Sequence, residues 1–114
     1  MDAPDAEEIS LKVTEGPALT MPVVKQTVSV IHRQGLHARP AAIFVQAAKR
    51  FGSRVTVKKG RKIVDGKSIM GLLTLAANQG ARIAIVVDGD DAQEALERLV
   101  EIVTKPLVES AEHG

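Results

Sequence analysis

The stretch Gly35-Leu36-His37-Ala38-Arg39-Pro40-Ala41 organises the rest of the chain, because these residues stand directly before an apolar run with helical spacing. Gly35 permits a tight turn. Pro40 is tolerated in the first turn of a helix, where its missing N–H costs nothing. The pattern therefore predicts a helix from about residue 38 to residue 51, with His37 at or near its N-cap.

A histidine in that position has a specific chemical use. The N-terminus of a helix offers unpaired N–H groups and a partial positive charge, which together favour an anion. A neutral imidazole held there can attack phosphorus, and the phosphoryl group that it gains is dianionic. Arg39 adds a fixed cation suited to phosphate. The hypothesis is that His37 accepts and passes on a phosphoryl group, although the same spacing is typical of a histidine that only caps a helix.

Apolar periodicity predicts the remaining elements. Residues that alternate between apolar and polar predict strands at 24–31, 54–59, 62–65 and 82–87. Helical spacing predicts two further helices, one from Ser68 to a stop at Gly80 and one at 92–103. Asp91 and Glu94 resemble a capping box. The order β-α-β-β-α-β-α and the polar outer faces predict an α+β fold, a four-stranded, mostly antiparallel sheet with three helices on one face.

Two motifs resemble a known family. The stretch around His37 resembles the active-site signature of the HPr family, the histidine phosphocarriers of the bacterial sugar phosphotransferase system. A second stretch, Gly66-Lys67-Ser68-Ile69-Met70-Gly71-Leu72-Leu73, is similar to that family's regulatory serine segment, in the same order and at about the same spacing. The resemblance covers about residues 21–103. It implies an HPr-like open-faced β-sandwich and attack by Nδ1 of His37.

The resemblance also implies the partners. Enzyme I, charged by phosphoenolpyruvate, would phosphorylate His37, and enzyme IIA domains would accept the group. Arg39 would stabilise the phosphoryl group, bind the partner's acidic surface, or both. The chain would be a carrier rather than a stand-alone enzyme, with no cofactor or metal of its own. The rival functions are a paralogue of the nitrogen-related branch, a purely regulatory binder and a small nucleic-acid-binding domain.

The segment around Ser68 has a structural and a regulatory interpretation. Serine is a suitable N-cap for the helix that follows, and the resemblance implies phosphorylation there by an HPr kinase/phosphorylase. Within the helix, one apolar stripe is expected to face the core (Leu72, Leu75, Ala76). A neighbouring stripe either joins the core or forms an exposed docking patch for partners, and the resemblance favours docking (Ile69, Met70, Leu73).

Composition limits the other possibilities. The chain has 114 residues and no cysteine, which fits one small domain in a reducing cytoplasm. Phe44 and Phe51 are the only aromatic residues, so base stacking on exposed rings is almost unavailable. No apolar run is long enough to span a membrane, and the first twenty residues lack the core of a signal peptide.

The charge is unevenly distributed. Residues 1–20 carry −4 and residues 104–114 carry −1, which leaves +6 on residues 21–103. The expected organisation is an acidic, mobile N-terminal extension (1–22), an HPr domain (23–104) that acts as a monomer, and a C-terminal tail (105–114). A basic domain favours anionic partners. The lysines and arginines around the 59–62 turn, and the other two histidines, His32 and His113, are expected to be solvated.

Overall fold

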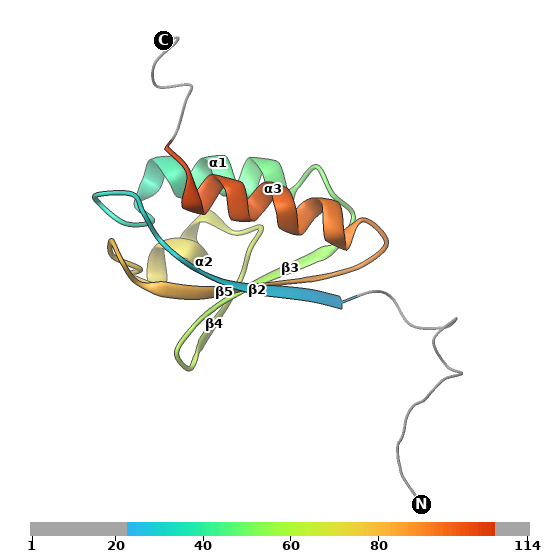
Figure 1. Cartoon of the computed structure of the whole chain (residues 1–114), viewed down its shortest axis with the longest axis horizontal. Coiled ribbons are helices and arrows are strands. Elements are labelled where there is room, and N and C mark those ends of the chain that lie inside the picture. The colour runs from blue at the N-terminus through green and yellow to red at the C-terminus, as the bar shows by residue number, and fades with distance from the viewer. Residues whose placement is uncertain (1–22, 107–114) are drawn as a thin grey trace, which may run out of the picture.

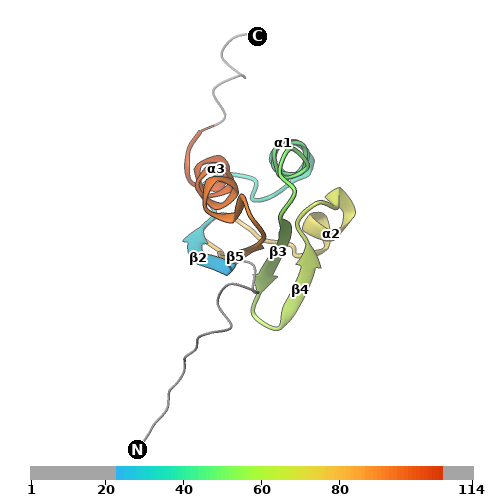
Figure 2. The same ribbon diagram turned by 90° about the vertical axis from the view of Figure 1, so that its right-hand side faces the viewer.

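The computed structural model describes residues 23–106 as a four-stranded sheet with three helices on one face (Figures 1 and 2). This architecture confirms the predicted α+β open-faced sandwich. The expected N-terminal extension, His113 and most of the C-terminal tail lie outside the described residues. The elements are β2 (Val23–Ser29), α1 (Ala38–Ala48), β3 (Arg54–Lys59), β4 (Lys62–Asp65), α2 (Ile69–Thr74), β5 (Arg82–Asp88) and α3 (Ala92–Thr104).

The sheet has the order β2-β5-β3-β4, and each neighbouring pair is antiparallel. The register sets Val24 and Val55 on either side of Val87, and Val57 opposite Ile85. Except for the half-buried Val24, these side chains are almost fully buried under the helices. The core is therefore aliphatic, as the composition requires. None of the helices in residues 23–106 is long and apolar enough to cross a membrane.

Helix α1 ends at Ala48, three residues earlier than the apolar pattern predicts. The N–H groups of Arg50 and Phe51 bond three residues back, to the carbonyls of Ala47 at 3.1 Å and Ala48 at 3.2 Å. Bonds of this type tighten the last turn of a helix. The chain then enters β3 through the turn at Gly52.

Helix α2 is much shorter than predicted, because it ends at Thr74 rather than just before Gly80. Ala76 adopts a left-handed backbone with φ 52°, which breaks the helical path. Its side chain is exposed, so the expectation that Ala76 belongs to the core stripe is wrong. Leu72 and Leu75 are buried as predicted.

Lysines of the β3–β4 hairpin bind the carbonyls at the end of α2. Lys59 Nζ donates to the carbonyls of Leu75 at 3.2 Å and Ala76 at 3.3 Å, and Lys62 Nζ donates to Thr74 at 2.6 Å. Cations at a helix C-terminus satisfy the last carbonyls and favour the helix dipole. The hairpin lysines are thus partly structural, and not only a solvated basic surface.

Helix α3 follows the predicted spacing but not the predicted cap. Asp91 occupies the N-cap position without a side-chain capping bond. Its carboxylate instead accepts hydrogen bonds from the Gly52 N–H at 2.9 Å, the Ser53 N–H at 3.0 Å and Ser53 Oγ. These donors, the Ser53 hydroxyl first, hold the pKa of the Asp91 carboxyl below its ordinary value. The capping box is therefore wrong, and Asp91 joins the start of α3 to the α1–β3 turn.

Candidate functional site

His37 is the N-cap of α1, as the sequence predicts. Its backbone is extended, with φ −81° and ψ −170°, and its carbonyl accepts the Ala41 N–H at 3.0 Å. Its Nδ1 faces the Arg39 N–H at 3.4 Å, which is longer than an ordinary N–H···N bond. The half-buried ring therefore presents Nδ1 to the positive end of the helix while its lone pair is only weakly engaged.

The loop before His37 is fixed by backbone bonds. The Gly35 N–H donates to the His32 carbonyl at 2.8 Å, and the Leu36 N–H donates to the Ala77 carbonyl at 2.9 Å. Gly35 has φ +74°, and a Cβ at this position would collide with the Ala77 carbonyl. Glycine is thus required twice, for the left-handed turn and for the close approach of two backbones.

His32 connects the same loop to the last helix. Its Nε2 lies 2.9 Å from the carbonyl of Ile102, and the Ile31 N–H lies 3.4 Å from the carbonyl of Val103. Pro106 has no N–H with which to satisfy Ile102, so the His32 ring supplies the missing donor. The expectation that His32 is solvated is therefore wrong. The turn towards α3 also ends β2 at Ser29 instead of residue 31.

His37 and Arg39 line one open depression of about 570 Å³ at the N-terminus of α1. Within residues 23–106, no carboxylate contributes to its wall. The other lining residues come from the β2–α1 loop and the end of α3: Ile31, His32, Arg33, Gln34 and Pro106. Two arginines and two histidines around one depression make a site with the charge to hold a phosphate or carboxylate group.

Ser68 is the N-cap of α2 and is not part of that depression. Its Oγ accepts the Gly71 N–H at 3.0 Å, which is an ordinary capping bond. Of the residues expected in a docking patch, Met70 is 69% exposed and Ile69 is 39% exposed. Leu73 is half-buried against the core. Figure 2 shows α2 beside α1 and β4, so the patch stands next to the helix that carries His37.

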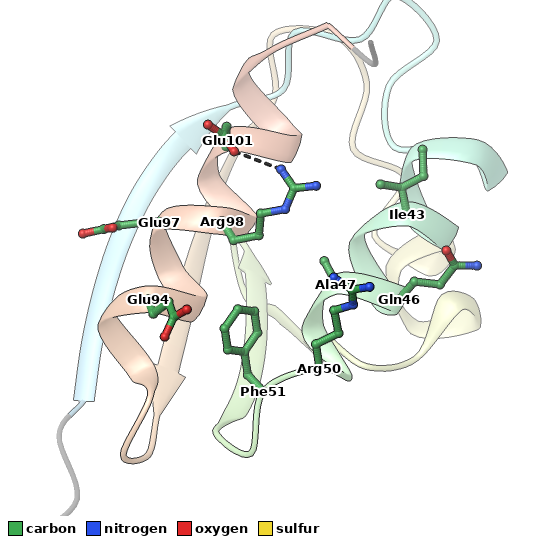
Figure 3. A pocket seen from close by; sticks show the side chains of 9 residues that line it. All are labelled: Ile43, Gln46, Ala47, Arg50, Phe51, Glu94, Glu97, Arg98 and Glu101. Carbon is green, nitrogen blue, oxygen red and sulfur yellow. Dashed lines mark hydrogen bonds and ion pairs between the residues drawn. The ribbon is translucent and has the colours of Figure 1, made fainter. Parts of the chain in front are cut away.

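A second groove, which the sequence does not signal, lies between α1 and α3 (Figure 3). It measures about 600 Å³ and contains side chains of both charges, with Arg98 and Glu101 paired at 2.9 Å. Arg50 reaches it from the end of α1 and Glu97 from α3. The groove contains no histidine, and residues 23–106 contain no cluster of side chains suited to hold a metal ion.

Comparison with known proteins identifies the family. A family model described as the PTS HPr component phosphorylation site matches residues 24–105. The chain belongs to the HPr family of phosphocarrier proteins. The phosphocarrier protein HPr of Haemophilus influenzae is 47% identical over 76 residues, which cover 67% of this chain and 89% of that protein. The crystal structure of HPr from Bacillus anthracis matches with a TM-score of 0.70 and 46% identity, over 72% of this chain and 98% of that one.

The HPr family also contains HPr-like proteins with another name. The HPr-like protein Crh of Halalkalibacterium halodurans is 46% identical over 83 residues, which cover 73% of this chain and 99% of that protein. Overall similarity therefore places this chain about equally near both kinds of relative. The phosphocarrier role in the phosphotransferase system is that of the family.

Proposed function

We propose that this HPr-family protein carries a phosphoryl group on His37, taken from enzyme I and delivered to enzyme IIA domains. The observation that carries the proposal is the position of the imidazole. Its Nδ1 lies towards the first N–H groups of α1, inside a depression that the described part of the chain lines with arginine and without a carboxylate. A phosphoryl dianion on Nδ1 would meet these N–H groups and the positive end of the helix dipole.

The transfer is a displacement at phosphorus. The Nδ1 lone pair of His37 forms the new P–N bond while the bond between phosphorus and the donor's histidine breaks, and the donor ring keeps that electron pair. Delivery to the acceptor reverses the roles. Because an imidazole replaces an imidazole, the bond broken resembles the bond made, and the group stays transferable in either direction.

Arg39 is proposed to bind the phosphoryl group during transfer. It is exposed, follows His37 by two residues and lines the same depression. A guanidinium can offer two parallel N–H donors to phosphate oxygens. The surrounding positive charge also favours partners that present carboxylates around their own histidine.

Ser68 is proposed as a regulatory phosphorylation site for an HPr kinase/phosphorylase. Its present capping role does not exclude modification, because the residue is half-buried rather than enclosed. Phosphate would add about −1.5 to −2 charges beside the exposed Ile69 and Met70. A partner that docks there with acidic groups would then bind less tightly.

Incubation with enzyme I and labelled phosphoenolpyruvate tests the central proposal. Acid-labile, base-stable label on His37, lost in His37→Ala, is the expected result. Label on another residue, or none in a chain that is demonstrably folded, would contradict it. Passage of the label to an enzyme IIA domain in a second incubation tests the carrier step.

A regulatory binding role is the second candidate function. The exposure of Ile69 and Met70 favours it, since a solvent-facing methionine suits a surface that several partners share. One related solution structure is that of Crh, the Bacillus subtilis catabolite repression HPr. The proposed monomeric state also needs measurement, because solved relatives include dimers. Ultracentrifugation and phosphoryl uptake on the same sample separate these possibilities.

A further inference from the structure

The depression at His37 contains one cation that the phosphocarrier proposal does not use. Arg33 lines it together with His37 and Arg39. The β-turn from His32 to Gly35, closed by the Gly35 N–H bond to the His32 carbonyl at 2.8 Å, has Arg33 and Gln34 as its two central residues. Arg33 is exposed and forms no hydrogen bond or ion pair of its side chain to any residue between 23 and 106.

Two hydrogen bonds hold the residues at the start of the turn that carries Arg33. His32 Nε2 is bonded to the carbonyl of Ile102 at 2.9 Å, and Gln79 Nε2 donates to the carbonyl of Ile31 at 3.2 Å. The Cα of Arg33 is therefore held beside the depression, and the long side chain alone is free to adjust. A cation placed in this way loses little backbone entropy when it closes on an anion.

We infer that Arg33 and Arg39 form a two-arginine clamp on the phosphoryl group carried by His37. The inference rests on the proposed function and assigns Arg33 a direct phosphoryl-binding role. Arg33 precedes His37 in the sequence and Arg39 follows it. The two guanidinium groups therefore belong to different segments, the turn before His37 and the first turn of α1. Each can donate two N–H groups to the phosphoryl oxygens, while the N-terminus of α1 serves the remaining oxygen.

A pair of arginines should change the titration of the phosphoryl group more than a single arginine does. A phosphoryl dianion is balanced by two unit charges, so the clamp favours the dianion over the monoanion and lowers the second pKa of the phosphoryl group below its value with one arginine alone. This titration is measurable on the carrier alone. It depends on electrostatic proximity and not on the recognition of any partner.

The experiment uses ³¹P NMR on the full chain phosphorylated chemically with phosphoramidate, with the His37 signal assigned by its loss in His37→Ala. Arg33→Ala is expected to raise the phosphoryl pKa by about 0.2 to 0.7 unit, the range of an exposed charge interaction. Arg33→Lys should lie between wild type and Arg33→Ala, because it keeps the charge and loses the fork. Arg50→Ala removes an arginine from the other groove (Figure 3) and should leave the titration unchanged.

Phosphoryl uptake from enzyme I gives an independent readout. Arg33→Ala is expected to lower kcat/KM for uptake about three- to tenfold, more at low salt than at high salt. If Arg33→Ala titrates as wild type does, or if Arg50→Ala shifts the titration equally, the clamp is overturned. If enzyme I fails to label wild-type His37 while the chemically phosphorylated protein shows the Arg33 shift, the phosphocarrier proposal fails and the anion clamp stands.

Discussion

The N-termini of α1 and α2 each have a side chain at the N-cap that accepts a hydrogen bond from the first turn. They differ in how strong that capping hydrogen bond is. Ser68 caps α2 through Oγ at 3.0 Å from the Gly71 N–H, an ordinary hydrogen bond. His37 stands at the same position of α1, with Nδ1 at 3.4 Å from the Arg39 N–H. The serine oxygen is committed to the fold, whereas the imidazole lone pair is nearly free. A cap that is poorly satisfied can therefore serve as a nucleophile, because little structure depends on it.

The largest expected effect comes from His37. His37→Ala should abolish phosphoryl uptake from enzyme I while the free energy of unfolding falls by less than about 1 kcal/mol, since the lost capping bond is long. His37→Asn is the sharper variant, because asparagine caps helices well and cannot carry the group. Label counting and chemical denaturation measure the two quantities. A mutant that unfolds would show that the His37 cap is needed for the fold. A mutant that still takes label at α1 would show that His37 is not the nucleophile.

Arg39 should have the next largest effect. Arg39→Ala is expected to slow uptake on the order of tenfold to a hundredfold, because a donor to the transferring group is lost. The fold should persist, since the side chain is exposed and forms no hydrogen bond or ion pair with any residue between 23 and 106. Rapid-quench kinetics of label uptake measure the rate. An unchanged rate would show that Arg39 does not take part in phosphoryl transfer.

Substitutions at Ser68 can separate the capping role of this residue from the effect of a charge at the same position. Ser68→Asp should keep the melting temperature near wild type, because aspartate is as good an N-cap as serine. It should raise the Michaelis constant for phosphorylation by enzyme I about fivefold at low salt, and added salt should narrow the difference. Ser68→Asn is the matched control, which caps equally and carries no charge. Equal Michaelis constants for both variants and wild type would refute the electrostatic account.

The smallest of the cap effects on phosphoryl transfer should be that of Ser68→Ala. It removes the capping oxygen without adding charge, so it should cost about 1 kcal/mol of stability and leave the uptake rate of His37 within about twofold of wild type. Denaturation midpoints and uptake rates on the same preparation measure both. A large loss of uptake without a loss of stability would show that Ser68 contributes to the phosphoryl site itself.

Asp91 extends the comparison to α3, whose N-cap carboxylate binds Gly52 and Ser53 instead of its own helix. Its folded-state pKa is depressed, so its contribution to stability is present above its unfolded value of about 3.8 and is lost as the pH falls through the lower folded value. The melting temperature of wild type should therefore drop more than that of Asp91→Asn between about pH 5 and pH 2. Parallel pH profiles for the two proteins would contradict this assignment.

Periodicity was sufficient to predict the hairpin of β3 and β4. The β3 and β4 ranges agree with the sequence to the residue, because a hairpin pattern and its turn lie within twelve residues. The cap positions of His37 and Ser68 were also predictable, because caps are recognised from adjacent residues. Ile102, which is only 5% exposed, was not among the core positions that the pattern of the last helix predicted, although it continues the helical stripe of α3.

The errors arose where the deciding partner is distant in sequence. Lys59 and Lys62 lie in a hairpin, and no sequence pattern near α2 indicates that these lysines bind the last carbonyls of the helix. His32 is separated by 70 residues from the carbonyl that it binds. Asp91 had a local option in the capping box with Glu94, and its carboxylate instead binds Ser53, 38 residues away. Such choices depend on which elements pack together, which periodicity does not encode.

The bond from His32 to Ile102 has a consequence for biosynthesis. It spans 70 residues, so the loop that presents His37 gains this brace only after α3 has been synthesised and docked. A chain still on the ribosome therefore carries the histidine long before it carries the finished site. We expect ribosome-bound chains that stop before α3 to take no label from enzyme I, and chains extended by a linker beyond residue 106 to take it. The synthesis and docking of α3 would thus determine when a newly made carrier molecule can first take part in phosphoryl transfer.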